Sequence, residues 1–65
     1  MARQWDATVS GYQKDIYTKR VSYARKKQKV TVLASSKEMA KEEIILQALA
    51  YGFVDPTIDH MVENK

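Results

Sequence analysis

Apolar and polar residues alternate over the first part of the chain. In residues 4–12, QWDATVSGY, the apolar Trp5, Ala7 and Val9 take every second position, and polar residues stand between them. A period of two predicts a strand with one buried face. Gly11 interrupts the alternation, which indicates a bulge or the close approach of another backbone segment. A turn is predicted directly afterwards, over residues 13–15.

Two further strands are predicted before the helix. Residues 16–25, IYTKRVSYAR, are rich in β-branched and aromatic types. Residues 29–35, KVTVLAS, alternate again, with Val30 and Val32 on one face. The basic run RKKQ, residues 25–28, lies between the two segments. We therefore expect these strands to form a hairpin with the charged residues at its tip.

A helix is predicted from residue 36 to Tyr51. The stretch Ser35-Ser36-Lys37-Glu38 fits a capping box in which Ser35 is the N-cap and Glu38 lies three residues later. Gly52 suits the position just after a helix, where the backbone is often left-handed. Leu46 lies off the main apolar stripe and is a candidate dimer contact. The stripe has helical spacing and consists of Met39, Ala40, Ile44, Ala48 and Tyr51, widened by Ile45 and Leu49.

The last segment, FVDPTIDHMVENK, supports two interpretations. As a strand, it places Ile58, His60 and Val62 at alternate positions. As a helix over residues 55–64, it has Asp55 as a cap and Pro56 at the first helical position, where proline is favoured. Both interpretations agree with the local chemistry, so the pattern alone leaves them open.

These elements predict an α+β fold in one small domain, residues 1–65. The expected architecture is an antiparallel sheet of three to four strands with one helix packed on one face, in a ββαβ-like order. The residues expected in the core come from the apolar phase of each element. They are Trp5, Val9, Val21, Val30, Val32, Met39, Ile44, Ala48 and Leu49.

Composition narrows the classes of function. The chain has 65 residues, no cysteine and a single histidine, which excludes a disulfide framework and a thiolate metal site. A core this small offers little room for a catalytic pocket, and no nucleophile accompanies His60 and Asp59, so we expect neither an enzyme nor a cofactor. No apolar run approaches the length of a membrane span, and no targeting segment is evident. We therefore expect a cytoplasmic protein that does not enter a membrane.

The charges divide the chain into two halves. Residues 1–33 carry eight lysines and arginines against two aspartates, a net charge of +6, whereas residues 34–65 carry three lysines against six acidic residues, a net charge of −3. Such asymmetry is typical of a surface that binds a polyanion or an acidic partner. The candidate contact residues for a partner or for nucleic acid are Arg20, Arg25, Lys26, Lys27 and Lys29, with Tyr17 and Tyr23 available to stack on bases. The alternative is that the cluster is only the solvated end of a hairpin.

Three short patterns resemble a group of small phage-encoded proteins. They are Trp5-x-Ala7-Thr8-Val9, then Val30-x-Val32-x-Ala34-Ser35 with Ala40, and Ala48-x-x-x-Gly52-Phe53-Val54. The host RNA polymerase inhibitor of podophages has a similar layout. The resemblance implies a ββαβ fold and a host-targeting accessory role in the host cytoplasm. Residues 15–27 have no counterpart in that pattern, and the last segment is acidic where the inhibitor is basic, so neither the target nor the contact residues carry over.

Three functions from different classes agree with these features. The first is a non-enzymatic interaction protein that binds a host macromolecular machine, in transcription or nucleic-acid metabolism, and inhibits or modulates it. The second is a dimeric DNA-binding repressor of the ribbon-helix-helix type, built from strand 29–34, helix 36–51 and a second helix over residues 56–64. The third is a structural subunit with no activity of its own. The last segment decides between the first two, because a strand there favours the interaction protein and a helix favours the repressor. A homodimer is open in either case.

Overall fold

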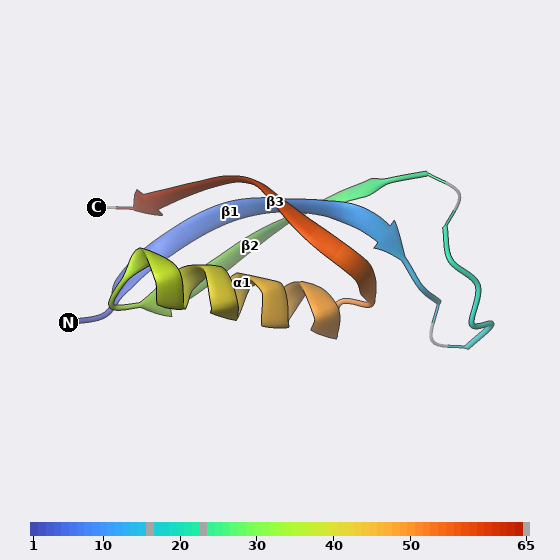
Figure 1. Cartoon of the computed structure of the whole chain (residues 1–65), viewed down its shortest axis with the longest axis horizontal. Helices are drawn as coiled ribbons and strands as arrows, with labels where there is room; N and C mark the ends of the chain where they lie inside the picture. The colour runs from blue at the N-terminus through green and yellow to red at the C-terminus, as the bar shows by residue number, and fades with distance from the viewer. Residues whose placement is uncertain (16, 23, 65) are drawn as a thin grey trace.

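The described part of the chain forms three strands and one helix (Figure 1). The computed structural model describes residues 1–15, 17–22 and 24–64. The elements follow in the order β1 (Arg3–Gln13), β2 (Lys26–Ala34), α1 (Lys37–Ala50) and β3 (Phe53–Asn64). The strands make one antiparallel sheet in the order β2-β1-β3, with β1 in the centre. The predicted α+β fold with a ββαβ order is therefore confirmed.

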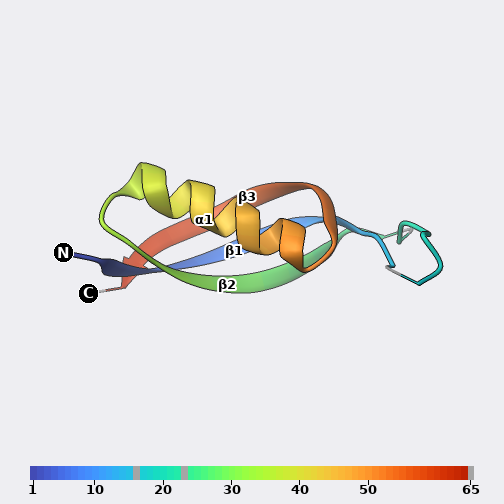
Figure 2. The same ribbon diagram turned by 90° about the horizontal axis from the view of Figure 1, so that it is seen from below.

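The molecule is long and narrow, and the helix lies along one face of the sheet. The principal extents are 41 × 17 × 14 Å. Figures 1 and 2 show both chain termini at one end of the long axis and the loop between β1 and β2 at the other. The opposite face of the sheet carries no helix and is called the open face below.

The alternation in residues 4–12 predicted β1 and its buried side correctly. Ala7 and Val9 lie against the helix, and Ala7 is paired with Val30 of β2. Trp5 is paired with Val32, and both side chains are buried. Since Val30 and Val32 are buried as expected, the core-facing side predicted from their alternation is confirmed.

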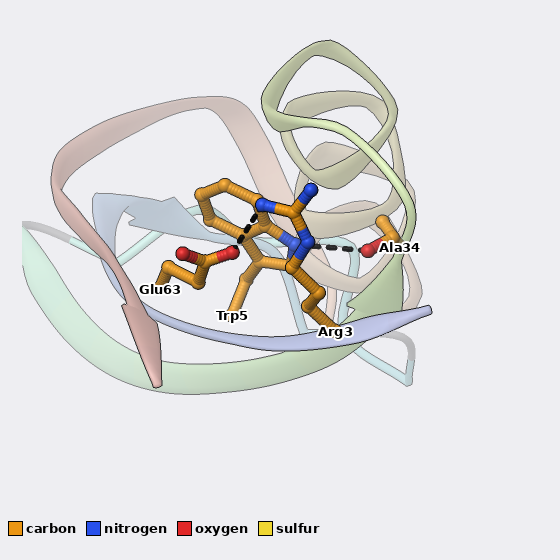
Figure 3. A network of polar contacts seen from close by, with 4 residues as sticks. All are labelled: Arg3, Trp5, Ala34 and Glu63. Atoms are coloured by element: carbon orange, nitrogen blue, oxygen red, sulfur yellow. Dashed lines mark hydrogen bonds and ion pairs between the residues drawn. The ribbon is translucent and has the colours of Figure 1, made fainter. Parts of the chain in front are cut away.

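Trp5 anchors the end of the sheet where the termini lie (Figure 3). Its indole nitrogen Nε1 donates a hydrogen bond of 3.0 Å to the carbonyl oxygen of Ala34, so the ring is buried without an unsatisfied donor. Beside it, the Arg3 guanidinium pairs with the Glu63 carboxylate at 2.6 Å, which ties β1 to β3. The expectation that Trp5 is a core anchor is confirmed.

The last segment is a strand, and its helix interpretation is wrong. β3 pairs antiparallel with β1 from Gln13↔Phe53 to Gln4↔Asn64, which buries Phe53. The register shifts twice, between Thr8 and Val9 and between Ser10 and Tyr12. Gly11 lies at the second shift with φ +156°, and a Cβ there would stand 3.4 Å from Phe53 Cδ1. The bulge indicated by Gly11 is therefore present.

The helix is one residue shorter at each end than expected, and its N-cap differs from the predicted one. Ser36, not Ser35, is the N-cap, because the Ser36 hydroxyl accepts from the Met39 backbone N–H at 3.3 Å. With Ser36 as the N-cap, Met39 occupies the third helical position, so the predicted capping box with Glu38 is wrong. Gly52 follows the helix with φ +92°, where a side chain would be strained, and it ends the helix as predicted.

A narrow stripe of the helix is buried. Met39 and Leu49 were expected in the core and are 51% and 50% exposed, so both expectations are wrong. The reason is geometric: the sheet of three strands covers only the row of helix residues spaced four apart, and Met39 and Leu49 lie on the outer side of the helix. The core consists of Trp5, Ala7, Val9, Val30, Val32, Ala34, Ala40, Ile44, Ala48 and Phe53.

The strand predicted over residues 16–25 is wrong, and so is the hairpin built on it. The described part of this segment forms a loop, with one isolated antiparallel bridge between Lys14 and Val21. Val21 was expected in the core and is 46% exposed, because it lies beyond the end of the helix-covered sheet. β2 pairs with β1 instead, from Gly11↔Lys26 to Arg3↔Ala34. Tyr23 lies outside the described residues.

Candidate partner-binding surface

The predicted basic cluster lies on a strand and not at a hairpin tip. Lys26, Lys27 and Lys29 belong to the first four residues of β2, Arg25 immediately precedes them, and all four are exposed. Lys27 is paired with Ser10 and Lys29 with Thr8 of the central strand. These two lysines have the opposite parity to the buried Val30 and Val32, so they stand on the open face. The strand fixes the backbone positions of the lysines.

The loop between β1 and β2 brings Arg20 to the same end of the molecule. Its chain reverses at Asp15, whose Oδ1 accepts from the backbone N–H groups of Tyr17 at 2.7 Å and Thr18 at 3.0 Å. The Asp15 N–H then donates to the Arg20 carbonyl at 2.8 Å. Arg20, Lys14 and Lys26 line one hollow of about 330 Å³. The loop therefore groups three cations that follow one another at intervals of six residues.

The same turn fixes the charge of Asp15. Because its carboxylate accepts hydrogen bonds from Thr18 and Tyr17, the pKa of Asp15 is lowered from its ordinary value. The Tyr17 side chain is 88% exposed and belongs to no strand, so the expected pair of stacking tyrosines on one strand is not formed by the described residues.

Arg25 is held in place by a chain of side chains that crosses the open face. Its Nη2 donates to Ser10 Oγ at 3.0 Å, and Ser10 Oγ donates to Asp59 Oδ1 of β3 at 2.9 Å. The guanidinium carbon also lies 5.7 Å from the centroid of the Tyr12 ring, which is within range of a cation–π contact. Ser10 is the buried polar residue of this network. Arg25 is thus a fixed cation next to the exposed lysines.

Sequence reasoning missed Ser10, Tyr12 and Asp59. Ser10 and Tyr12 lie in the polar phase of the alternation over residues 4–12, and that phase was the available signal. It shows which residues share the open face of β1. It does not show that Arg25 and Asp59 stand beside them, because that depends on the pairing of β2 and β3.

A shallow hollow lies further along the open face. Thr8 is flanked by Lys29 on one side and His60 on the other, since it is paired with both. The hollow has a volume of about 260 Å³, and Asp6 and Thr31 also line it. His60 is therefore an exposed residue of β3, separated from Lys29 of β2 by Thr8 of the central strand.

Asp6 remains charged at one side of this hollow. Its carboxylate accepts hydrogen bonds from Thr31 Oγ1 at 2.8 Å, Gln4 Nε2 at 3.2 Å and Asn64 Nδ2 at 3.1 Å. These donors, Thr31 first, lower the pKa of Asp6 from its ordinary value. The three bonds join all three strands of the sheet on the open face.

Charge is separated along the long axis. We call the end of the molecule at the β1–β2 loop the basic end. It carries seven lysines and arginines and three acidic residues, Asp15, Asp55 and Asp59. The rest of the described chain holds Asp6, Glu63 and the three helix glutamates against three cations. Among residues 1–15, 17–22 and 24–64 the only ion pair is Arg3–Glu63, at the opposite end. The basic end consists of Lys14, Lys19, Arg20, Arg25, Lys26, Lys27 and Lys29.

The outer side of the helix is a second exposed surface. Met39, Leu46 and Leu49 are each at least half exposed there. A shallow hollow of about 460 Å³ is lined by Leu46 and Ile45 with Lys41 and Glu42. Leu46 is thus exposed, as expected of a residue off the buried stripe.

Three further findings concern membrane-spanning helices, metal sites and similarity to known proteins. Within the described ranges, no helix is long and apolar enough to cross a membrane. In the same ranges, no group of three histidine, cysteine or acidic residues is placed to hold a metal ion. No family model, curated protein or solved structure matches the chain. The resemblance to the phage inhibitor stays a prediction.

Proposed function

We propose that this chain is a small non-enzymatic binding protein that docks its basic end on an acidic surface of a macromolecular machine and so inhibits or modulates that machine. The observation that carries the proposal is the separation of charge along a molecule 41 Å long. Opposite charges at the two ends orient the molecule as it approaches an acidic surface, and such steering raises association rates about 10- to 1000-fold at low salt.

The geometry of the basic end favours a protein partner over duplex nucleic acid. Asp15, Asp55 and Asp59 stand among the cations, and a uniform row of phosphates would meet these carboxylates as like charges. Protein surfaces offer mixed charges that suit such a pattern. The ribbon-helix-helix alternative loses its basis, because residues 53–64 form the strand β3 where that fold needs a second helix.

The fixed position of Arg25 adds to this proposal. Its contacts with Ser10 and Tyr12 hold the guanidinium before any partner arrives. A cation that is already ordered loses less conformational entropy on binding. The exposed Lys27 and Lys29 lie on the same face as Ser10, so they extend this surface along β2.

The test compares two variants that each lose two positive charges. In the first, Lys27→Ser and Lys29→Ser remove charges from the basic end; in the second, Lys37→Ser and Lys41→Ser remove them from the helix. The partner is captured with the tagged chain from a lysate of the cells in which the chain is made, and then purified. Association rates are measured at low and high salt. We expect the first variant to associate about tenfold more slowly at low salt and the second to match the wild type.

Two results would contradict the proposal. One is equal association rates for the wild type and the Lys27/Lys29 variant at low salt. The other is tighter binding to duplex DNA than to the captured protein. In that case a plot of the logarithm of the binding constant against the logarithm of the salt concentration should have a slope near −3 to −4, because about four phosphate contacts contribute about −0.9 each. The second result would make nucleic acid the partner.

A further inference from the structure

The two outer edges of the sheet differ in regularity. β1 has a strand on each side, so β2 and β3 each present one edge with no strand beside it among the described residues. On β3 the edge is interrupted by the two register shifts, by Pro56, which has no N–H to donate, and by Asp55 with φ +51°. Such an edge is a poor template for another strand.

The outer edge of β2 is regular over its whole length. Its nine residues, Lys26–Ala34, pair with β1 without a bulge. Figure 2 shows β2 along one long side of the molecule, with no element beyond it. In an antiparallel strand, alternate residues direct both backbone N–H and C=O groups away from the neighbouring strand. β2 therefore offers a row of free backbone donors and acceptors in the right geometry for another strand.

The side chains along this edge restrict what can bind it. Lys26 stands on the helix side of the sheet by its parity, and Lys27 and Lys29 stand on the open face, so an added strand meets a cation on both faces. Lysine on an edge strand opposes pairing with a second copy of the same chain. Parallel self-pairing would set lysine beside lysine, and antiparallel self-pairing would leave every lysine without an opposite charge. An acidic strand is the occupant that the lysines favour.

The other half of the edge is uncharged. Thr31 is exposed there, and Leu33 is 69% exposed on the same face. Cross-strand neighbours of threonine and leucine that stabilise a sheet are β-branched or apolar residues. A matching strand is therefore acidic where it lies beside Lys26–Lys29 and β-branched or apolar where it lies beside Thr31–Leu33.

We propose that β2 binds an extended acidic segment of the partner as a fourth strand of the sheet, through the free backbone groups of its outer edge. This inference rests on the proposed function, and it names the part of the partner that is recognised and how. Backbone hydrogen bonds supply affinity for any extended segment, and the lysines select acidic ones.

The test uses a capped nine-residue peptide with glutamates in one half and alternating threonine and valine in the other, in both chain directions. Two further peptides with the same charges carry N-methyl groups at alternate residues, one in each phase. Only the phase that faces β2 needs its N–H groups. We expect methylation in that phase to weaken binding at least about tenfold and methylation in the other phase to have little effect.

The site of binding is measured by backbone amide exchange. We expect alternate amides of β2 to gain protection with the peptide and the amides of β3 to stay unchanged. The Lys27→Ser, Lys29→Ser variant should bind the peptide more weakly than the wild type, and this difference in affinity should shrink at high salt. The Lys37→Ser, Lys41→Ser variant should bind the peptide like the wild type. A peptide with glutamine in place of glutamate should bind at least about tenfold more weakly, since it offers no charge to the lysines.

Several results would overturn the inference. Two concern affinity: both methylated peptides bind as tightly as the unmethylated peptide, or the glutamine peptide binds as tightly as the glutamate peptide. Two concern amide exchange: the peptide protects amides of β3, or the protection of β2 amides rises with protein concentration alone. The last result would make a second copy of the chain the occupant. If both methylated peptides bind like the parent and the Lys27/Lys29 variant still binds more weakly, strand addition is wrong while charge-driven docking stands. If that variant changes neither peptide binding nor the association rate with the partner, the proposed function fails as well.

Discussion

Truncation of two apolar helix residues tests which face of α1 packs on the sheet. Ile44 is fully buried and is one of the two largest such side chains, whereas half of Leu49 is exposed. Ile44→Ala removes buried methylene groups and leaves a cavity under the helix, which costs about 2–5 kcal/mol. Leu49→Ala removes a side chain whose full burial would contribute about 1.5–3 kcal/mol. Since only half of it is buried, we expect a loss of about 1 kcal/mol.

The difference is large relative to the stability of so short a chain. At about 0.05–0.15 kcal/mol per residue, 65 residues correspond to a total unfolding free energy of about 3–10 kcal/mol. Ile44→Ala therefore removes a large share of it. The measurement is urea unfolding, followed by the fluorescence of Trp5 and by far-ultraviolet circular dichroism, with the two midpoints compared.

A milder substitution keeps the comparison measurable if Ile44→Ala does not fold. Ile44→Val removes one methylene group and should cost about 0.5–1.5 kcal/mol. Equal losses for Ile44→Ala and Leu49→Ala, or a larger loss at Leu49, would show that α1 packs on the sheet through a different face, rotated about the helix axis.

Two further predictions concern polar groups on the open face. The pKa of Asp6 is lowered in the folded state, chiefly by the hydrogen bond from the Thr31 hydroxyl. Asp6 therefore binds a proton more readily in the unfolded chain, and its ionised carboxylate stabilises the folded state above about pH 4. This stabilisation is lost as the pH falls through the folded-state pKa. The urea midpoint should therefore fall less for Asp6→Asn than for the wild type on acidification from about pH 5 to pH 2, and equal changes would refute the role of Asp6. Ser10→Ala should cost about 1–2 kcal/mol, because it leaves Arg25 and Asp59 without their shared partner, and a loss below about 0.5 kcal/mol in the same assay would show that this network contributes little.

The fold followed from local patterns wherever one face of an element is buried. The alternation around Trp5 and Val9 placed β1, and that around Val30 and Val32 placed the core face of β2. The stop at Gly52 gave the end of the helix. In each case the pattern reports burial of one face, which local sequence records directly.

The pairing of strands did not follow from local patterns. Residues 16–25 have strand-forming side chains, and their nearness in sequence to β2 favoured a hairpin. β1 is the better partner for β2, because its buried phase matches Val30 and Val32 over nine residue pairs. In residues 16–25, Lys19 interrupts the phase that Tyr17 and Val21 share, so this segment offers no comparable apolar face. Sequence proximity therefore predicted the wrong neighbour.

The secondary structure of the last segment also did not follow from its local sequence. Its local chemistry allowed a helix that starts at Pro56 and also allowed a strand. The sheet decides, because pairing with β1 as a strand buries Phe53 and packs Ile58 and Met61 against the core. Proline fits an edge strand at a bulge, and Pro56 lies in that position.

The candidate site was predictable in its charges and not in its neighbours. Arg20, Arg25 and the lysines are exposed cations, as their run in the sequence indicates. The partners of Arg25 were hidden, because the Arg25–Ser10 bond joins residues 15 apart in sequence and the Ser10–Asp59 bond joins residues 49 apart. Contacts of this range depend on the strand order, which the sequence pattern left undetermined.

The move of the lysines from a predicted tip to an edge strand changes what they can do. At a hairpin tip, flexible cations would provide attraction without selection. On β2, the same cations lie along the regular outer edge of the sheet, so in the proposed complex charge and hydrogen bonding would act on one ligand together. Lysine on an edge is also the usual protection against unwanted pairing, and the two roles agree: the lysines that repel a second basic strand attract an acidic one. Whether they protect or recognise thus depends on the charge of the strand that arrives, which is the property that the paired glutamate and glutamine peptides isolate.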